Sequence, residues 1–126
     1  LMQTMPADMD AVDALIYLNR ELFTMIEDSI SIDLLARLLS TQLLARGEKH
    51  LLDRSRYYFR LLRQIISNGQ KNGQLRGDMS GNEILKAYAM WERALLYDWC
   101  LCGGEYSLSA YTGRMTPGFL DMYRKK

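Results

Sequence analysis

The sequence predicts an all-α fold, a single domain of five helices over residues 1–126. Apolar residues recur every three or four positions along most of the chain, which is the period of a helix with one buried face. Proline and glycine number only 2 and 9, too few for the many tight turns of a β-sandwich. The chain is 48% hydrophobic and 25% charged, as a folded globular domain is. Folding should bury about two thirds of the unfolded surface, so no disulfide or metal is needed for stability.

The first helix is expected over residues 8–28 and the second over residues 32–46. Pro6 precedes the first helix, where proline is tolerated, and Ser31 can cap the second. Gly47 is expected to end the second helix because glycine readily adopts the left-handed conformation. Three acids lie near the start of the first helix, where the helix dipole favours negative charge. They are Asp8, Asp10 and Asp13.

The third helix is expected over residues 48–68, with apolar residues on one side and arginines on the other. The glycine- and amide-rich stretch 69–74 should end it. A connection over residues 73–82 follows, in which Ser80 and Glu83 have the spacing of a capping box.

The fourth helix, expected from Glu83 to about Cys102, is apolar on more than one side. One stripe comprises Ile84, Tyr88, Trp91, Leu95 and Trp99. A second stripe, about 100° away, comprises Ala87, Met90, Ala94, Tyr97 and Leu101. A five-helix domain cannot easily surround one of its own helices, so the pattern predicts that a partner chain covers the second stripe.

The fifth helix is expected from Ser107 to about Tyr123. Pro117 lies inside it and should kink or split it near Thr116, because proline removes a backbone donor and its ring crowds the preceding turn.

Charge is distributed unevenly along the chain. Residues 1–36 carry seven acids and one base, a net of −6, whereas residues 37–76 carry nine bases and two acids, a net of +7. We favour complementary helix faces that neutralise each other within the fold, and a basic docking surface is the alternative. The overall net charge of +1 lacks the basic excess typical of a nucleic-acid-binding domain.

No catalytic set can be assembled, so we expect neither an enzyme nor a cofactor. His50 is the single histidine and has no motif around it, which favours a surface position. Cys100 and Cys102 lie about 200° apart on a helix, so neither a mutual disulfide nor a metal site is expected. Asp98 should pair with an arginine or face a cavity.

No apolar run reaches the about 20 residues that are needed to span a bilayer, and no signal peptide is visible. We therefore expect a cytoplasmic protein that makes no membrane contact and whose thiols are reduced.

The chain is rich in adaptable side chains, with 8 Met, 8 Tyr and 2 Trp. Together these suit a cavity for varied flat or apolar molecules, although each of them alone could simply fill the core. We expect the cavity between the third and fourth helices. The candidate ligand-binding residues are Tyr58, Leu62, Met90 and Trp91.

Residues 94–99 (ALLYDW), 105–108 (EYSL) and 119–123 (FLDMY) resemble the C-terminal half of TetR/AcrR-type transcriptional regulators. Residues 65–76 (IISNGQKNGQLR) are similar to the connection between the seventh and eighth helices of that family. The resemblance covers residues 60–126, whereas the earlier residues match only in helix order and length.

The resemblance implies an effector-binding domain that dimerises through its last two helices, which form a four-helix bundle with those of a partner. It implies a homodimer and a small apolar or aromatic effector. Operator DNA would be bound only by an N-terminal helix-turn-helix unit that this chain, starting at Leu1, does not include. Pro117 departs from the regular last helix of the family. The expected interface residues are Tyr97, Leu101, Leu108, Tyr111 and Met115. The alternative is a stand-alone helical adaptor that binds a protein through its fourth helix and no small molecule.

Overall fold

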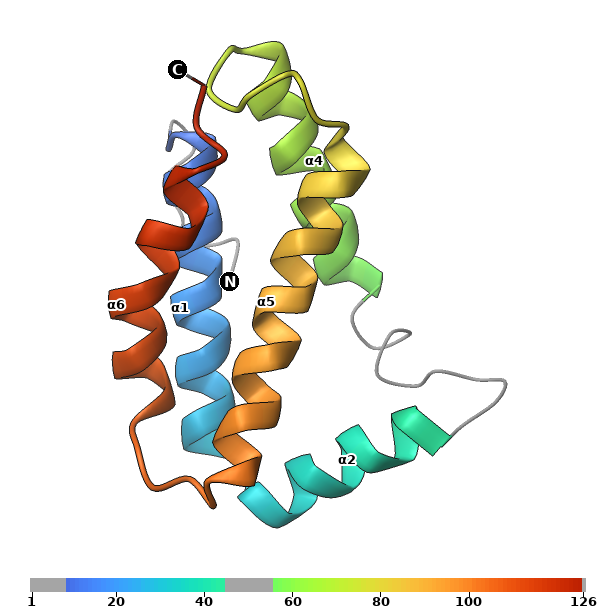
Figure 1. Cartoon of the computed structure of the whole chain (residues 1–126), viewed down its shortest axis with the longest axis vertical. Coiled ribbons are helices and arrows are strands. Elements are labelled where there is room, and N and C mark those ends of the chain that lie inside the picture. The colour runs from blue at the N-terminus through green and yellow to red at the C-terminus, as the bar shows by residue number, and fades with distance from the viewer. Residues whose placement is uncertain (1–8, 45–55, 126) are drawn as a thin grey trace.

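The structure, a computed structural model, describes residues 9–44 and 56–125. These residues form five helices (Figure 1), which confirms the all-α fold. The helices are α1 (Ala11–Ser29), α2 (Ile32–Leu44), α4 (Arg56–Lys71), α5 (Gly81–Leu101) and α6 (Leu108–Asp121). The predictions for Asp8, Gly47, His50 and the first part of the third helix fall outside the described residues.

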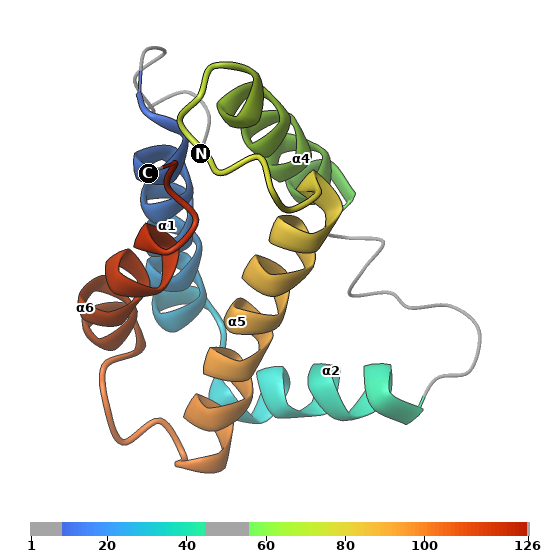
Figure 2. The same cartoon turned by 45° about the horizontal axis from the view of Figure 1, so that its top comes forward.

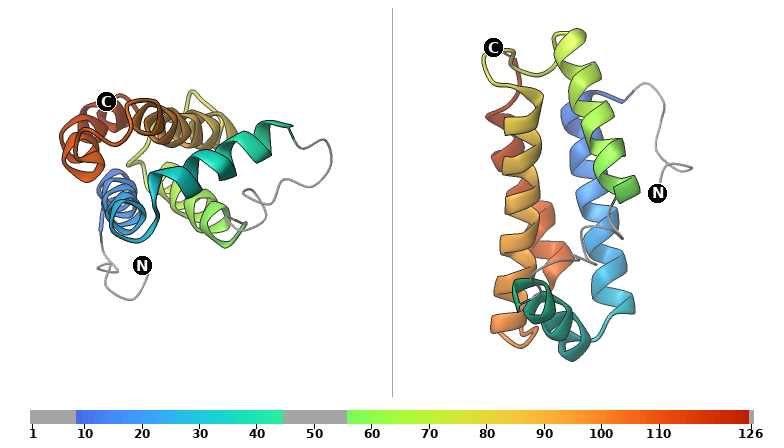
Figure 3. Two further views of the ribbon diagram at one scale, coloured as in Figure 1. Left: turned by 90° about the horizontal axis from the view of Figure 1, so that it is seen from below. Right: turned by 90° about the vertical axis from the view of Figure 1, so that its right-hand side faces the viewer.

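Four of the helices form a ring, in which α1 packs against α6 and α4, and α5 packs against the same two helices from the other side. The view from below shows this ring, with α2 crossing it (Figure 3). The α2 helix packs against the C-terminal half of α5, and its far end stands away from the bundle (Figure 2). A short antiparallel bridge between Leu75 and Arg124 ties the α4–α5 connection to the end of the chain.

The helix starts follow the predicted caps. The Ser80 side chain accepts from the Glu83 backbone, and the Glu83 carboxylate accepts from the Ser80 backbone, which confirms the capping box. Ser107 caps α6 through the Ala110 N–H, and Ser31 accepts from the Leu34 N–H. Asp10 caps α1 in the same way, by accepting from the backbone N–H of Val12.

Glycine shapes the turn after α5. Gly103 and Gly104 both have positive φ, 63° and 72°, a conformation that L side chains rarely adopt. A Cβ on Gly104 would also lie 1.9 Å from Ile32 Cδ1, so the Ile32 side chain would have to move to make room for it. The α4 helix, in contrast, runs through Gly69 to Lys71, slightly further than predicted.

The core consists of two apolar clusters. The first joins the N-terminal half of α1 to α4, the start of α5 and the end of α6, with Leu15, Leu62 and Tyr88 fully buried. The second joins the other half of α1 to α2, the end of α5 and the start of α6, around Phe23 and Trp99. Between them lies a layer of buried polar side chains, which are Asn19, Glu92, Thr112 and Thr116.

Of the kink or split expected at Pro117, the split is wrong, because α6 continues from Leu108 to Asp121 with Pro117 inside it. Neutralisation of the basic middle by the acidic first third is not seen as ion pairs: none joins the two in residues 9–44 and 56–125. Asp10 and Asp13 instead pair with Arg124 near the C-terminus, at 3.2 and 3.1 Å.

Candidate functional site

The outer side of the α5–α6 pair is an apolar surface, which we call the α5–α6 face. Its six large side chains are between 42% and 68% exposed. They are Met90, Tyr97 and Leu101 of α5, Tyr111 and Met115 of α6, and Met122, which directly follows α6. Apart from the half-buried Ala87, the second stripe of α5 is therefore exposed in the single chain, whereas the first stripe is buried or half-buried.

The two halves of the α5–α6 face lie on the same side of the bundle. The helices run antiparallel (Figure 1), and they meet where Trp91 stacks on Phe119 with ring centroids 4.5 Å apart. The Trp91 indole N–H also donates to the Thr116 hydroxyl, at 3.0 Å. On both helices the exposed stripe lies next to this contact and away from the core, since helical positions advance by 100° per residue. We therefore expect the two stripes to lie on the same side of the α5–α6 pair.

Four of the five expected interface residues lie on this face. Leu108 does not, because it is fully buried in the chain's own core with Phe23 and Trp99. It is the first residue of α6 and packs against residues of α1 and α5, so its side chain is not accessible to a partner. Met122, which the sequence did not single out, belongs to the face instead.

A buried carboxylate lies at the centre of the bundle. Glu92 is 6% exposed, and its Oε2 accepts hydrogen bonds from the Tyr58 hydroxyl at 2.9 Å and from the Asn19 amide at 3.1 Å. The Tyr88 hydroxyl lies 3.3 Å from that of Tyr58 and donates to the Leu15 carbonyl. We call Glu92, Tyr58, Tyr88, Asn19 and Thr116 the polar cluster.

Burial raises the pKa of Glu92 to about 7, although the hydrogen bonds from Tyr58 and Asn19 and the charge of Arg93 lower it. Within the described residues no ion pair involves Glu92. Burial and the nearby Glu92 carboxylate likewise raise the pKa of Tyr58 and of Tyr88, so both hydroxyls stay protonated as donors. Thr116 extends the cluster to α6 by donating to Asn19 Oδ1 at 3.1 Å.

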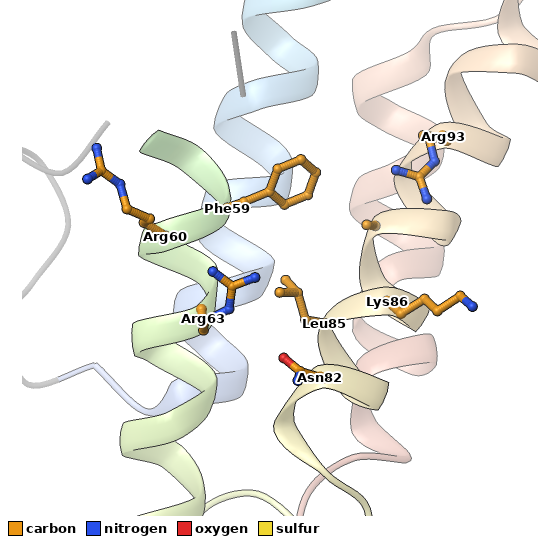
Figure 4. A pocket seen from close by; sticks show the side chains of 8 residues that line it. Phe59, Arg60, Arg63, Asn82, Leu85, Lys86 and Arg93 are labelled. Atoms are coloured by element: carbon orange, nitrogen blue, oxygen red, sulfur yellow. The ribbon is translucent and has the colours of Figure 1, made fainter. Parts of the chain in front are cut away.

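A groove of about 430 Å³ runs between α4 and α5 on a different side of the bundle from the α5–α6 face. We call it the α4–α5 groove. It is lined by Phe59, Arg60, Arg63, Asn82, Leu85, Lys86, Ala89 and Arg93. Figure 4 shows Phe59 and Arg63 reaching from α4 toward Leu85 and Asn82 of α5, while Arg60 and Lys86 point away along the two sides.

The four candidate ligand-binding residues do not line one cavity. Tyr58 belongs to the polar cluster and Leu62 is fully buried in the core. Trp91 packs against α6, and Met90 is exposed on the α5–α6 face. Adjacent residues on a helix point 100° apart, so Met90 and Trp91 cannot face the same interior. The groove is bordered instead by Phe59, the neighbour of Tyr58, and by residues one turn from Leu62 and Met90.

Other chemical candidates have structural roles. Asp98 pairs with no arginine in the described part of the chain, and accepts a hydrogen bond from the Tyr106 hydroxyl at 2.9 Å. Cys100 and Cys102 are free and half-buried. Over residues 9–44 and 56–125, no three metal-ligating side chains gather at one place. None of the helices in those residues combines the length and apolar character needed to cross a membrane.

Sequence reasoning missed Glu92, which looked like an interruption in an apolar helix. A signal was available, because Glu92 lies on the same side of α5 as Tyr88, Leu95 and Trp99, all of them buried. Comparison of the chain with family models, with curated proteins and with solved structures gives no match.

Proposed function

We propose that the chain is the ligand-sensing and dimerisation domain of a TetR/AcrR-like transcriptional regulator. It would act in the cytoplasm, where free thiols such as Cys100 and Cys102 stay reduced. A helix-turn-helix unit outside this chain would bind DNA. The observation that carries the proposal is the α5–α6 face, an exposed apolar surface on the two helices that the motif resemblance assigns to dimerisation.

A second copy of the chain is the occupant that fits the α5–α6 face best. Monomeric soluble proteins rarely expose contiguous apolar patches larger than a few hundred Å². Two antiparallel helices with outward apolar stripes can pack against the same surface of a second copy about a two-fold axis. The product is a four-helix bundle, in which side chains of both copies interlock.

The polar cluster supplies a route from a ligand to the dimer. Tyr58 links α4 to Glu92 of α5, Glu92 contacts Asn19 of α1, and Asn19 contacts Thr116 of α6. A change in the position of α4 therefore alters hydrogen bonds that hold both dimerising helices. A ligand that binds two arrangements of these helices with different affinity shifts the population between them, which would change the spacing of the attached DNA-binding units.

The dimer is tested by light scattering after size-exclusion chromatography at micromolar concentration. The wild-type chain should elute as a dimer, and Leu101→Glu and Tyr97→Glu should elute as monomers, because each places a charge in the apolar interface. Leu34→Glu is the matched control, since Leu34 is equally exposed but lies on α2. A monomeric wild type, or unchanged dimers in both α5 variants, would refute the proposal.

A stand-alone adaptor is the second candidate, because the same face could bind a helix of another protein. It predicts a monomer that binds no small molecule. The coding sequence upstream of Leu1 separates the two: a helix-turn-helix of about fifty residues, long enough for a three-helix recognition unit, supports the regulator, and a start codon at that point supports the adaptor.

A further inference from the structure

We propose that the α4–α5 groove binds an amphipathic anion, a small molecule with a carboxylate or phosphate head and an apolar body. This names the effector class of the proposed sensing function and rests on that function. The groove combines two features that seldom occur together: an apolar floor formed by Phe59, Leu85 and Ala89, and four surrounding cations without an acid among the lining residues.

The cations of the groove form no ion pair within the described protein, although the charge of Arg93 acts on the neighbouring Glu92. No ion pair in that part of the chain involves Arg60, Arg63, Lys86 or Arg93. Among the described residues, Asp10 and Asp13 pair with Arg124, and Asp78 pairs with Arg76. The groove therefore keeps a positive field that an incoming anion can neutralise.

The α4 helix concentrates this charge in an unusual way. It contains four bases and no acid over Arg56–Lys71. Arg60 and Arg63 are three residues apart, a spacing at which like charges on a helix repel. A bound anion would relieve this repulsion.

Arg63 is the residue best placed to hold the head of the ligand. Figure 4 shows its guanidinium between the helices, facing Asn82 across the groove. A guanidinium donates two parallel hydrogen bonds to a carboxylate or phosphate, and the Asn82 amide can add another. The apolar body then lies along Leu85, Ala89 and the Phe59 ring, which form the floor.

The size and composition of the groove favour a small molecule over a macromolecule. Its volume of about 430 Å³ falls within the range of small-molecule sites. A nucleic-acid backbone would use the cations but leave the apolar floor empty. A neutral apolar effector would use the floor but not Arg63, so neither occupant matches the whole surface.

A ligand in the groove would contact residues that are next in sequence to members of the polar cluster. Phe59 follows Tyr58 in α4, and Arg93 follows Glu92 in α5. A ligand that separates these walls therefore acts on the Tyr58–Glu92 hydrogen bond, 2.9 Å long in the free protein. The groove is thereby coupled to α1 and α6 through Asn19 and Thr116.

The test is isothermal titration calorimetry of the whole chain with matched probes. Dodecanoate and dodecyl phosphate, both below their micelle concentrations, should bind at least tenfold more tightly than dodecanol, which lacks the charge, and than acetate, which lacks the chain. Arg63→Gln should weaken dodecanoate binding at least tenfold. Arg20→Gln, which removes an exposed arginine from α1, should leave it unchanged.

Three results would overturn the proposal. The first is equal affinity for dodecanol and dodecanoate. The second is unchanged dodecanoate affinity in both Arg63→Gln and Arg93→Gln, with both variants folded by circular dichroism. The third is binding only to vesicles containing phosphatidylglycerol, to an oligonucleotide or to polyglutamate, which would assign the groove to a membrane, a nucleic acid or an acidic protein.

The oligomeric state, measured on the same samples, separates this inference from the proposed function. A dimer that binds no dodecanoate refutes only the groove ligand. A monomer that binds dodecanoate through Arg63 refutes only the dimerisation domain.

Discussion

Replacement of Glu92 by glutamine should remove a large pH dependence from the stability of the fold. Glu92 is buried among neutral groups, with Tyr58 and Asn19 donating to the same oxygen. The carbonyl oxygen of a glutamine can accept both of these hydrogen bonds. The substitution therefore keeps the shape and the acceptor while removing the buried charge.

The direction follows from the pKa. The pKa of Glu92 is 4.5 in its ordinary state and about 7 in the folded protein, where burial opposes ionisation. Between these values the folded state binds more protons than the unfolded state, so the free energy of unfolding falls as the pH rises. The difference between the two pKa values corresponds to about 3 kcal/mol, complete above pH 7 and absent below pH 4.5.

In thermal terms, a loss of about 3 kcal/mol lowers the melting temperature of a chain of this length by about 10 °C. The assay is thermal and urea unfolding, followed by circular dichroism between pH 4.5 and pH 8. The free energy of unfolding of wild type should fall by about 3 kcal/mol between pH 4.5 and pH 8 because of Glu92, and this contribution should be absent from Glu92→Gln. The difference between the two profiles isolates Glu92, because every other titratable group is present in both proteins.

Glu105→Gln is the matched control, since it removes the same charge from an exposed position. Its profile should follow that of wild type. If the free energy of unfolding changed with pH in the same way in wild type and in Glu92→Gln, ionisation of Glu92 would not destabilise the folded state. That result would refute the reasoning.

Three further substitutions test local features by urea unfolding. Gly104→Ala should destabilise the fold by at least about 2 kcal/mol, because it combines a positive φ with a clash against Ile32; a neutral effect would contradict the turn geometry. Gly113→Ala, in open space inside α6, should stabilise by up to about 1 kcal/mol; a loss would mean that α6 is not helical there. Glu27 accepts from the backbone of Leu108 and Ser109 at the start of α6. Burial opposes its ionisation, but these bonds and those of the nearby hydroxyls lower its pKa overall. Glu27→Gln should lower the free energy of unfolding by about 1 kcal/mol at neutral pH. This difference from wild type should shrink as the pH falls through the lowered pKa of Glu27, which urea unfolding at a series of pH values would detect.

The helices could be predicted from the sequence because their signals are local. Ser80 and Glu83 act within one turn of helix, and Ser107 caps α6 with a residue three positions away. The stripes of α5 also follow from the helical period, which correctly separates the buried Trp99 from the exposed Leu101.

Positions that depend on the meeting of distant elements could not be predicted in the same way. Leu108 and Tyr111 share an apolar pattern in the sequence, but only Leu108 leans on α1 and α5. The pattern shows that a residue is apolar, and the packing decides whether the chain itself or a partner covers it. Met90 was expected in the same cavity as Trp91, but neighbouring residues of a helix point in directions about 100° apart.

The net charges of the sequence segments were a poor guide to which side chains form ion pairs. The totals for residues 1–36 and 37–76 are opposite and nearly equal, which favoured mutual neutralisation. The chain instead folds so that Arg124, from outside both segments, takes Asp10 and Asp13. Arg60 and Arg63 of α4 lie beside the groove and form no ion pair within the described protein. Opposite charges in a sequence neutralise each other only if the fold brings them together.

The polar cluster gives this bundle a property that its apolar clusters cannot supply. The apolar residues of α4 pack only into the first cluster, where many apolar side chains of similar volume can replace one another. A slide of α4 by one turn would separate Tyr58 from Glu92 and leave a buried carboxylate with a donor missing, which is costly. The cluster therefore fixes the register of α4 against α1 and α5, although burial of Glu92 costs stability at neutral pH. The walls of the α4–α5 groove begin at the residues next to Tyr58 and Glu92, so a ligand there would act at the point where the register of the bundle is decided.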